Sequence, residues 1–303
     1  MITLIALKER TKAVLLLAVT AALWSIGGLF IKLVDANPFV IAGVRSAISA
    51  IVLLAILKKP RFNWSLPQIG AGFACAATTI LFVLANKTTT AANAILLQFT
   101  APIYVALISS WFLKEKVKLS DWITIIFAIG GMGMFFYDNL SAQGMLGNLF
   151  AAASGLTFAM FTIFMRMQKN GSPTESVLMG NLITAAIGLP FLFTSVPDTS
   201  GWIYLVILGV FQLGIPYAIY SIAIKNATAL EAILIPVIEP LLNPVWVFIF
   251  IGEVPSIIAL AGGVIVLAAI TVRCILAIRY TGENNKHHSC KTTAEAALLK
   301  NNG

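Results

Sequence analysis

The sequence predicts an all-α membrane protein with ten transmembrane helices in two inverted five-helix repeats. Its 303 residues are 59% hydrophobic and only 11% charged, whereas soluble domains carry about 25% charged residues. Apolar runs long enough to cross about 30 Å of hydrocarbon recur along nearly the whole chain, and the two halves of the sequence resemble each other. A transmembrane β-barrel is not expected, because its strands would alternate apolar and polar residues.

The apolar runs define ten expected spans, joined by short loops rich in turn-forming residues. The first run follows the basic segment 1–12 and is too long for the core of a signal peptide, so it is expected to remain as a span. Residues 281–303 form a polar tail. The spans lie near 13–34, 38–57, 66–86, 91–113, 120–137, 145–166, 175–194, 201–223, 230–251 and 257–277.

Basic residues gather on one side of this topology. Clusters at 8–12, 58–61 and 114–118 fall on that side, whereas the other side has only Lys32 and Lys87 near its ends. By the positive-inside rule, both termini are predicted to be cytoplasmic, in a multi-pass protein of the plasma membrane. The net charge of +8 therefore reflects topology and does not indicate a nucleic-acid partner.

An internal repeat supports the division into halves. Residues 87–115 align with residues 225–253 at a constant offset of 138, and nine of the 29 aligned positions are identical, including a Lys, a Pro and a Glu. We infer a duplication, with one five-helix repeat at 13–137 and the other at 145–277. Because five is odd, the second repeat enters the membrane from the opposite face. Inverted repeats of this kind are common in secondary transporters that work by alternating access.

Three segments resemble the EamA-like branch of the drug/metabolite transporter superfamily: ALWSIGGLFIK (22–32), LLQFTAPIYVALISSWFLKE (96–115) and ILIPVIEPLLNPVWVFIFIGE (233–253). In that family a midplane proline is followed by an apolar stretch and a glutamate at the helix end. The resemblance implies ten helices in two repeats and transport of a small metabolite, without identifying it. We therefore expect a secondary active transporter of a small molecule such as an amino acid or organic amine, either an exporter or a proton-coupled carrier.

The expected ninth span combines several prolines with a carboxyl group near its middle. A proline removes a backbone donor, and the carbonyls left without partners must be satisfied by neighbours or line a wet cavity. A charge at this depth costs at least about 2.5–3.5 kcal/mol. Either Glu239 binds substrate or a proton, or it is protonated or bonded to a neighbouring helix and holds a kinked helix in place. Its helical face also carries Asn243 and Trp246, and kinks or hinges are expected at Pro102, Pro236, Pro240 and Pro244.

Arg45 is the second polar group expected deep in the membrane. It lies about two turns into the second span, about 12 Å from the outer end at 1.5 Å per residue. Because it cannot easily reach the surface from there, the guanidinium should meet an acid, exposed carbonyls or an anionic group of the substrate. A structural and a binding role remain equally open, as does pairing with Glu239.

Aromatic and amide side chains complete the candidate site. Trp24 and Tyr104 are expected near mid-depth, where with Glu239 they would suit an organic cation through cation–π contact. With Arg45 added, a zwitterion such as an amino acid fits better. Each aromatic residue has the alternative role of packing or of anchoring the protein at the interface. The other candidates are Phe82, Gln98, Trp111, Phe158, Gln212, Tyr217 and Tyr220.

Other function classes have weaker support. The only histidines, His287 and His288, lie in the tail and the sequence has no P-loop, so no cofactor, metal centre or ATP hydrolysis is expected. A channel or lipid scramblase is the alternative to a carrier, and a membrane-embedded enzyme is less favoured because a hydrophilic catalytic loop is lacking. Expected partners are a small-molecule substrate, the lipid bilayer and, for a coupled carrier, protons. A monomer and a homodimer fit the sequence equally well.

Overall fold

The chain folds into a bundle of helices in the part that the structure describes. This computed structural model describes residues 2–135, 137, 144–242 and 256–276. Eight helical segments there are long and apolar enough to cross a membrane. They are Lys8–Leu33, Pro38–Leu57, Leu66–Thr88, Asn93–Phe112, Met145–Met167, Pro173–Phe193, Thr199–Ala223 and Ile257–Leu276. The expected fifth span is a shorter helix of 17 residues, and the expected span 230–251 is described only to residue 242.

Several of these segments consist of two or three helical elements. The elements in chain order are α1 (Ile2–Trp24), α2 (Gly27–Leu33), α3 (Pro38–Leu57), α4 (Leu66–Thr88), α5 (Ala91–Gln98), α6 (Ala101–Phe112), α7 (Leu119–Phe135), α8 (Met145–Met167), α9 (Pro173–Gly188), η2 (Leu189–Phe193), α10 (Thr199–Ile207), η3 (Leu208–Gly214), α11 (Ile215–Ala223), α12 (Ala229–Leu234) and η4 (Ile235–Val237). The last described helix, Ile257–Leu276, carries no number. Because α1 begins at Ile2, the basic segment expected before the first span is itself helical.

Polar side chains cap the helices where the sequence expects loops. Ser65 accepts a hydrogen bond from the Gln68 backbone at the start of α4, and Asp198 accepts one from Gly201 at the start of α10. Such caps satisfy backbone donors that the first helical turn leaves without partners. Thr90 caps α5 and Thr228 caps α12 in the same way. These two threonines occupy equivalent positions in the internal repeat.

Four of the described membrane segments are irregular within their length. One is interrupted between α1 and α2, and another between α5 and α6, just before Pro102. A third contains the π-helical element η3, just before Pro216. In the expected ninth span, α12 passes into the 3-10 element η4, which contains Pro236. Proline and local changes of helix type each free backbone groups from the regular hydrogen-bond pattern.

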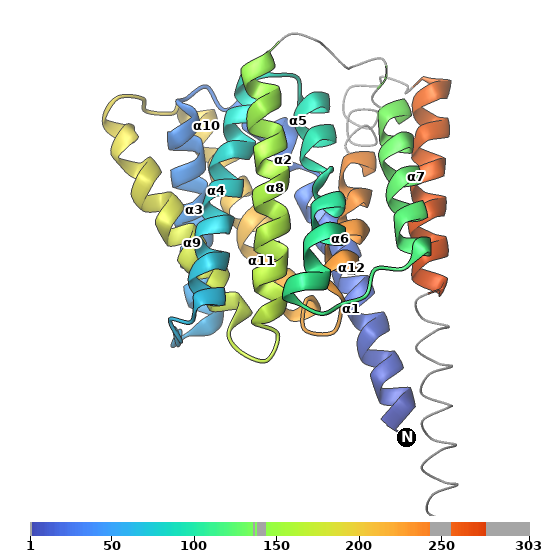
Figure 1. The fold of residues 1–303 in the computed structure, drawn as a ribbon. Coiled ribbons are helices and arrows are strands. Elements are labelled where there is room, and N and C mark those ends of the chain that lie inside the picture. The colour runs from blue at the N-terminus through green and yellow to red at the C-terminus, as the bar shows by residue number, and fades with distance from the viewer. Residues whose placement is uncertain (1, 136, 138–143, 243–255, 277–303) are drawn as a thin grey trace, which may run out of the picture.

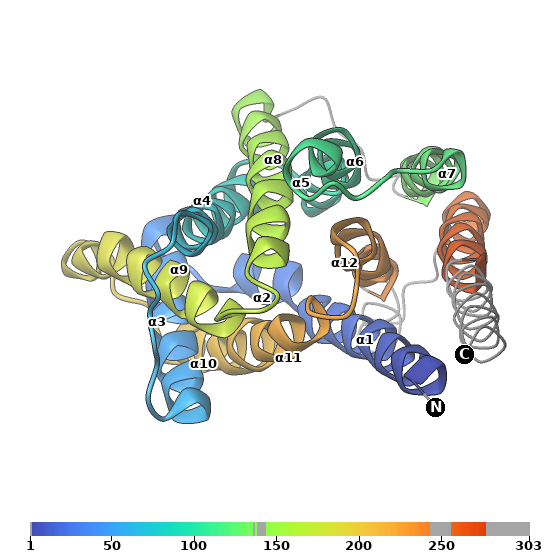
Figure 2. The same cartoon turned by 60° about the horizontal axis from the view of Figure 1, so that its bottom comes forward.

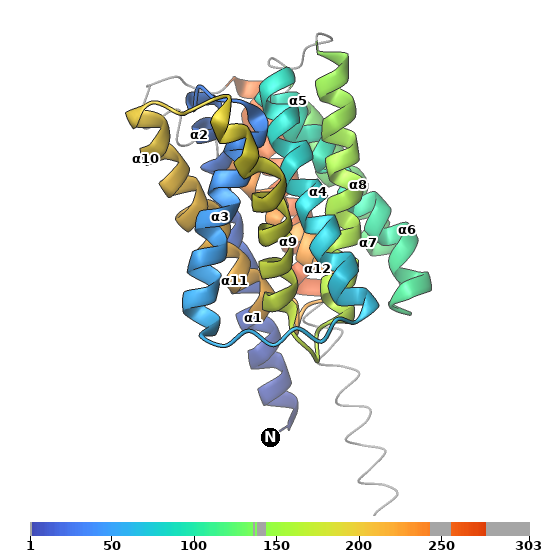
Figure 3. The ribbon, with the colours of Figure 1, turned by 90° about the vertical axis from the view of Figure 1, so that its left-hand side faces the viewer.

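Small residues bring the central helices close together. α3 lies against α9 and α4 against α8 (Figures 2 and 3). A Cβ atom added at Gly188 would lie 2.2 Å from the Phe39 carbonyl oxygen, and one at Gly43 would lie 2.6 Å from the Gly188 Cα atom. Close contact between backbones through glycine is a common way to pack membrane helices. On the opposite edge of the bundle, α7 packs with the last described helix (Figure 2).

The fourth and ninth segments run in opposite directions. In Figure 1, α5 lies near the top of the bundle and α6 below it, whereas α12 begins at the lower end. The Glu115 carboxylate, just after α6, accepts a hydrogen bond of 3.0 Å from the Ala229 backbone at the start of α12. The end of one aligned segment therefore meets the beginning of the other.

Candidate functional site

A cavity in the middle of the bundle brings together most of the sequence-predicted polar and aromatic candidates. Its volume is about 40 Å³. Because one water needs about 10–15 Å³, the cavity has room for about three waters. It is lined by Trp24, Arg45, Thr78, Thr79, Phe82, Gln98, Phe158, Gln212, Leu213, Tyr217 and Glu239.

Arg45 is the most deeply buried charged group of this site. Its side chain is 1% exposed and donates hydrogen bonds to the Gln212 side-chain oxygen at 3.2 Å and to the Thr79 carbonyl oxygen at 3.3 Å. Its Nε atom is buried without a hydrogen-bond partner. No carboxylate pairs with it among the residues that the structure describes. Two neutral acceptors compensate a buried guanidinium only in part, so the site favours an additional anionic group.

Glu239 lies on the chain just after η4 and lines the same cavity as Arg45. Its side chain is half-buried. In the described part of the chain it forms no hydrogen bond or ion pair, and no contact joins it to Arg45. One cavity therefore holds one basic and one acidic group, and neither has a partner of opposite charge among the described residues.

Trp24 forms the centre of the aromatic wall. Its ring packs edge-on against Phe158 at 5.9 Å and Tyr217 at 5.4 Å, and at a tilt against Tyr220 at 5.5 Å. Tyr220 itself is not among the lining residues; its hydroxyl is 3.1 Å from that of Thr162. The Trp24 indole N–H is buried without a hydrogen-bond partner. A buried indole N–H normally finds an acceptor, so this donor too is open to a bound molecule or to water.

The irregular segments place these groups around the cavity. Trp24 is the last residue of α1, Gln98 the last residue of α5, and Gln212 lies inside η3. Glu239 follows η4 by two residues. Interrupted helices at membrane depth are tolerated where they are buried in protein or line a cavity. Here the interruptions and the polar side chains occur together.

Several candidates lie elsewhere. Tyr104 is half-buried and packs against the hydrophobic core, and Trp111 is 84% exposed on the outside of the bundle. Pro102, Pro236 and Pro240 are buried, but none of the three lines the cavity. Asn243, Pro244 and Trp246 lie outside the described residues.

Sequence reasoning missed two threonines of the cavity. Thr78 bonds to Thr157 at 2.9 Å, and the Thr79 carbonyl accepts from Arg45. Gln98, which was predicted, donates to Ser154 at 2.8 Å. Two adjacent threonines in the middle of an apolar span are a weak signal that could have identified them. Their role depends on which face of α4 meets α3 and α8.

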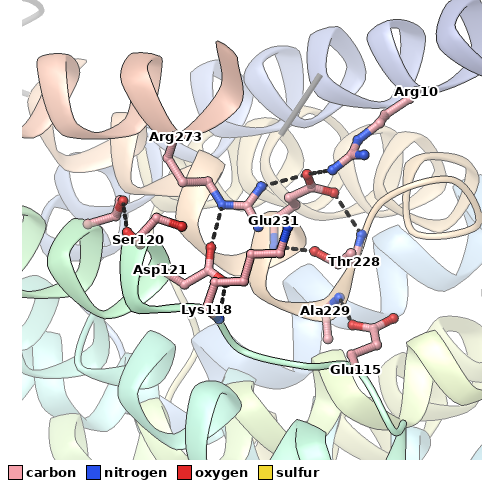
Figure 4. A network of polar contacts seen from close by, with 10 residues as sticks. Arg10, Glu115, Lys118, Ser120, Asp121, Thr228, Ala229, Glu231 and Arg273 are labelled. Atoms are coloured by element: carbon pink, nitrogen blue, oxygen red, sulfur yellow. Dashed lines mark hydrogen bonds and ion pairs between the residues drawn. The ribbon is translucent and has the colours of Figure 1, made fainter. Parts of the chain in front are cut away.

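A second polar cluster, also missed, lies at the end of the bundle where the N-terminus begins (Figure 4). Glu231 accepts charged hydrogen bonds from Arg10 and from Arg273, the latter at 2.6 Å. Arg273 also pairs with Asp121 at 3.1 Å. Glu231 completes a capping box with Thr228 at the start of α12. This terminal ion-pair network (Arg10, Glu231, Arg273 and Asp121) connects α1, α7, α12 and the last described helix.

Comparison with known proteins identifies the family. The sequence model of the EamA-like transporter family matches this chain twice, at residues 11–137 and 145–273. The chain belongs to the EamA-like transporter family. As a member of it, the chain is a multi-pass membrane transporter and not an enzyme.

Individual relatives of this EamA-like protein carry transporter names. The threonine/homoserine exporter RhtA of Escherichia coli strain K12 is 26% identical over 76% of this chain and 79% of its own length. The uncharacterized transporter YdfC of Bacillus subtilis is 29% identical over 73% of this chain and 76% of its own. An uncharacterized transporter of Archaeoglobus fulgidus is 26% identical over 64% of this chain and 71% of its own length. A crystal structure of a protein with 21% identity has the same fold, with a TM-score of 0.76 over 89% of this chain and 99% of that one.

Proposed function

We propose that this protein is a secondary active transporter that moves a small zwitterionic metabolite, such as an amino acid, by alternating access. The observation that carries the proposal is that Arg45 and Glu239 line one cavity and are not paired with each other. Arg45 would bind the carboxylate of the substrate, and Glu239 its ammonium group. Trp24 would add cation–π attraction for that ammonium group. RhtA, a relative named for the export of two amino acids, has a substrate of this class.

The size of the cavity supports a change of conformation during transport. About 40 Å³ is well below the roughly 300–1,000 Å³ of typical small-molecule sites. An amino acid could enter only if the surrounding helices moved apart. The interruptions near Trp24, Gln98 and Glu239 are suitable points for that movement, since hinges lie at element ends.

Two inverted repeats would explain how the movement alternates. The aligned segments 87–115 and 225–253 begin with equivalent threonine caps, and their ends meet head to tail through Glu115 and Ala229. Both features are expected of a pseudo-two-fold axis in the membrane plane. Rocking of one repeat against the other would expose the cavity to each side in turn.

Proteoliposomes provide the test of substrate class. We expect saturable counterflow of radiolabelled threonine, competed by other small amino acids. The corresponding amine without a carboxylate and the hydroxy acid without an amine should each compete at least tenfold less well. Competition by the amine alone would instead indicate an organic-cation carrier. Flux that neither saturates nor shows counterflow would indicate a channel.

Purified protein offers a second readout that does not depend on transport. A ligand present at 100 times its Kd stabilises the folded state by about 2.7 kcal/mol. Threonine should therefore raise the unfolding temperature of the native protein but not that of Arg45→Gln. Equal stabilisation of both proteins would contradict a role for Arg45 in binding.

The orientation follows from the distribution of basic residues: we infer that both termini are cytoplasmic in the plasma membrane. A single cysteine at Thr199, in a background lacking native cysteines, should react with an impermeant reagent from outside intact cells. Cysteines at Asn63 or Asn170 should react only after permeabilisation. All three positions are exposed, so a reversed pattern would overturn the orientation.

A further inference from the structure

A basic cavity opens at the end of the bundle beside the terminal ion-pair network. Its volume is about 430 Å³, and it shares no lining residue with the central cavity. Its basic lining residues come from α1, from the loop between α6 and α7, and from the last described helix. They are Arg10, Lys116, Lys118 and Arg273.

Positive charge exceeds negative charge around this cavity. Asp121 is the only acidic residue among those that line it in the described chain. Glu231 contacts two of the lining residues, Arg10 and Arg273 (Figure 4). Counted over the described residues, four basic side chains (Arg10, Lys116, Lys118 and Arg273) stand against two carboxylates here, and both lysines are exposed.

An apolar groove continues from the basic cavity along the outside of the bundle. Its volume is about 420 Å³, and it shares Ser120 and Leu276 with the basic cavity. One wall is α7 and the other is the last described helix. Small side chains, among them Ala268 and Ala269, form the floor of the groove, and large exposed side chains such as Phe127 form its sides.

The two helices converge at the inner end of the groove. A Cβ atom added at Gly262 would lie 2.4 Å from the Gly131 carbonyl oxygen, so the backbones touch there. From Ser120 to Phe127 the groove follows α7 for about 10 Å, at 1.5 Å per residue. The groove therefore starts at the basic cavity, runs toward the middle of the membrane and ends where the helices meet.

We propose that the basic cavity and the groove together form a binding site for an anionic phospholipid of the surrounding membrane. The phosphate lies among Arg10, Lys118 and Arg273, and one acyl chain lies in the groove between α7 and the last described helix. Basic pockets between membrane helices on the cytoplasmic side are suited to anionic headgroups. A free phosphate or a soluble metabolite would use the basic cavity but leave the groove empty, so the continuity of the two selects a lipid. In the orientation inferred above, the site faces the cytoplasmic leaflet.

The test measures thermal unfolding of delipidated protein in detergent against increasing phosphatidylglycerol. Phosphatidylcholine with the same acyl chains is the comparison lipid, and inorganic phosphate is the soluble anion. We expect saturable stabilisation by phosphatidylglycerol only. Equal stabilisation by both lipids would mean that the groove contacts bilayer lipids without selecting an anionic headgroup. Stabilisation by inorganic phosphate at the same concentrations would assign the site to a soluble anion. Either result overturns the proposal.

Charge variants test the headgroup. Lys116→Gln with Lys118→Gln should weaken phosphatidylglycerol binding about thirtyfold, because each basic residue near an anionic lipid contributes about fivefold. The matched control, Lys58→Gln with Lys59→Gln, removes two exposed lysines that line neither feature. Equal loss in both double variants would show general attraction to charge and contradict the site.

Groove variants test the acyl chain. Ala268→Leu fills the groove and should weaken binding of long-chain phosphatidylglycerol, while Ala261→Leu, exposed on the same helix but outside the groove, should not. All variants should unfold at the native temperature without lipid, because their side chains are exposed. Unchanged lipid affinity in Ala268→Leu would exclude the groove from the site.

Discussion

Arg45 donates a hydrogen bond of 3.2 Å to the side-chain oxygen of Gln212 in the interior of the bundle. The bond joins α3, in the first segment that the family model matches, to η3, in the second, at the central cavity. Because Gln212 is neutral, the positive charge of Arg45 remains available to an anionic group. The proposed binding role of Arg45 requires such a neutral partner, because a carboxylate in its place would already neutralise the guanidinium.

The Gln212 side chain offers a direct test. Gln212→Glu gives Arg45 a permanent counter-charge, so the affinity for a carboxylate-bearing substrate should fall at least tenfold while thermal stability is kept. Gln212→Ala leaves a buried donor without a partner and should cost about 1–3 kcal/mol of stability. Binding is measured by ligand-induced thermal shift and transport by counterflow. Gln98→Ala is the control, because Gln98 lines the same cavity but bonds to Ser154. Unchanged affinity in Gln212→Glu would mean that Arg45 is structural.

Glu239 should couple protons to transport. Glu239→Gln preserves shape but removes the exchangeable charge, so folding should be intact while the pH dependence of transport and net uphill transport are lost. Uptake driven by an imposed pH gradient is the measurement, and Glu175→Gln at the start of α9 is the control acid. Uphill transport by Glu239→Gln with an unchanged pH response would leave Glu239 only a structural role.

Glu231 should contribute more to stability than Glu115. Breaking a buried ion pair costs about 3–5 kcal/mol. Glu231 is 2% exposed, but its arginine partners are 18% and 10% exposed, so the lower end of that range is expected for Glu231→Gln. Glu115 is 23% exposed and pairs with Arg166 at 2.9 Å. Glu115→Gln should therefore lower the free energy of unfolding by only about 1 kcal/mol.

A double-mutant cycle of Arg10→Gln with Glu231→Gln checks that the Glu231 effect arises from the network. The double variant should be less destabilised than the sum of the single variants, by about 0.5–3 kcal/mol. Strict additivity in chemical denaturation would show that the two groups do not interact in solution.

The contact between α3 and α9 should not tolerate a methyl group. In Gly188→Ala the new Cβ atom would lie 2.2 Å from the Phe39 carbonyl oxygen, and the backbones must separate. A loss of about 1–3 kcal/mol is expected, as for other overpacked interiors. Gly130→Ala is the matched control, since nothing lies within 4 Å of its Cβ position, and alanine favours a helix over glycine there. Equal unfolding temperatures for both variants would contradict the close contact.

Much of the helical layout could be predicted from the sequence, because burial in lipid leaves a clear signal in every span. The expected span 38–57 coincides with α3, and 66–86 ends two residues before α4 does. The irregular segments were less accessible. Pro102 and Pro236 were expected kinks and lie at two of them, whereas Pro216, next to η3, was not recognised as a marker. The break after Trp24 has no proline in its own segment.

The kinds of residue in the candidate site could be predicted from the sequence, but only some of the particular residues that line the cavity could. Arg45 and Glu239 were identified because a charge inside an apolar run is costly, and both line the central cavity. Aromatic residues carry no such signal, since Trp24 on the cavity and Trp111 on the outer surface look alike in sequence. Thr78 and Thr79 were missed because a threonine in a membrane helix can satisfy its hydroxyl on its own backbone, as Thr78 does at 2.7 Å.

The sequence by itself determined the class of the molecule, its membrane environment and its internal repeat, because hydrophobicity and repetition are properties of the chain read in order. Tertiary structure decided which charges meet. Glu231 binds Arg10 and Arg273 at the end of the bundle, whereas Glu239, two turns further along the chain, lines the central cavity. Pairing between residues far apart in sequence depends on helix packing, and helix packing is decided by the fit of small and large side chains across many contacts at once.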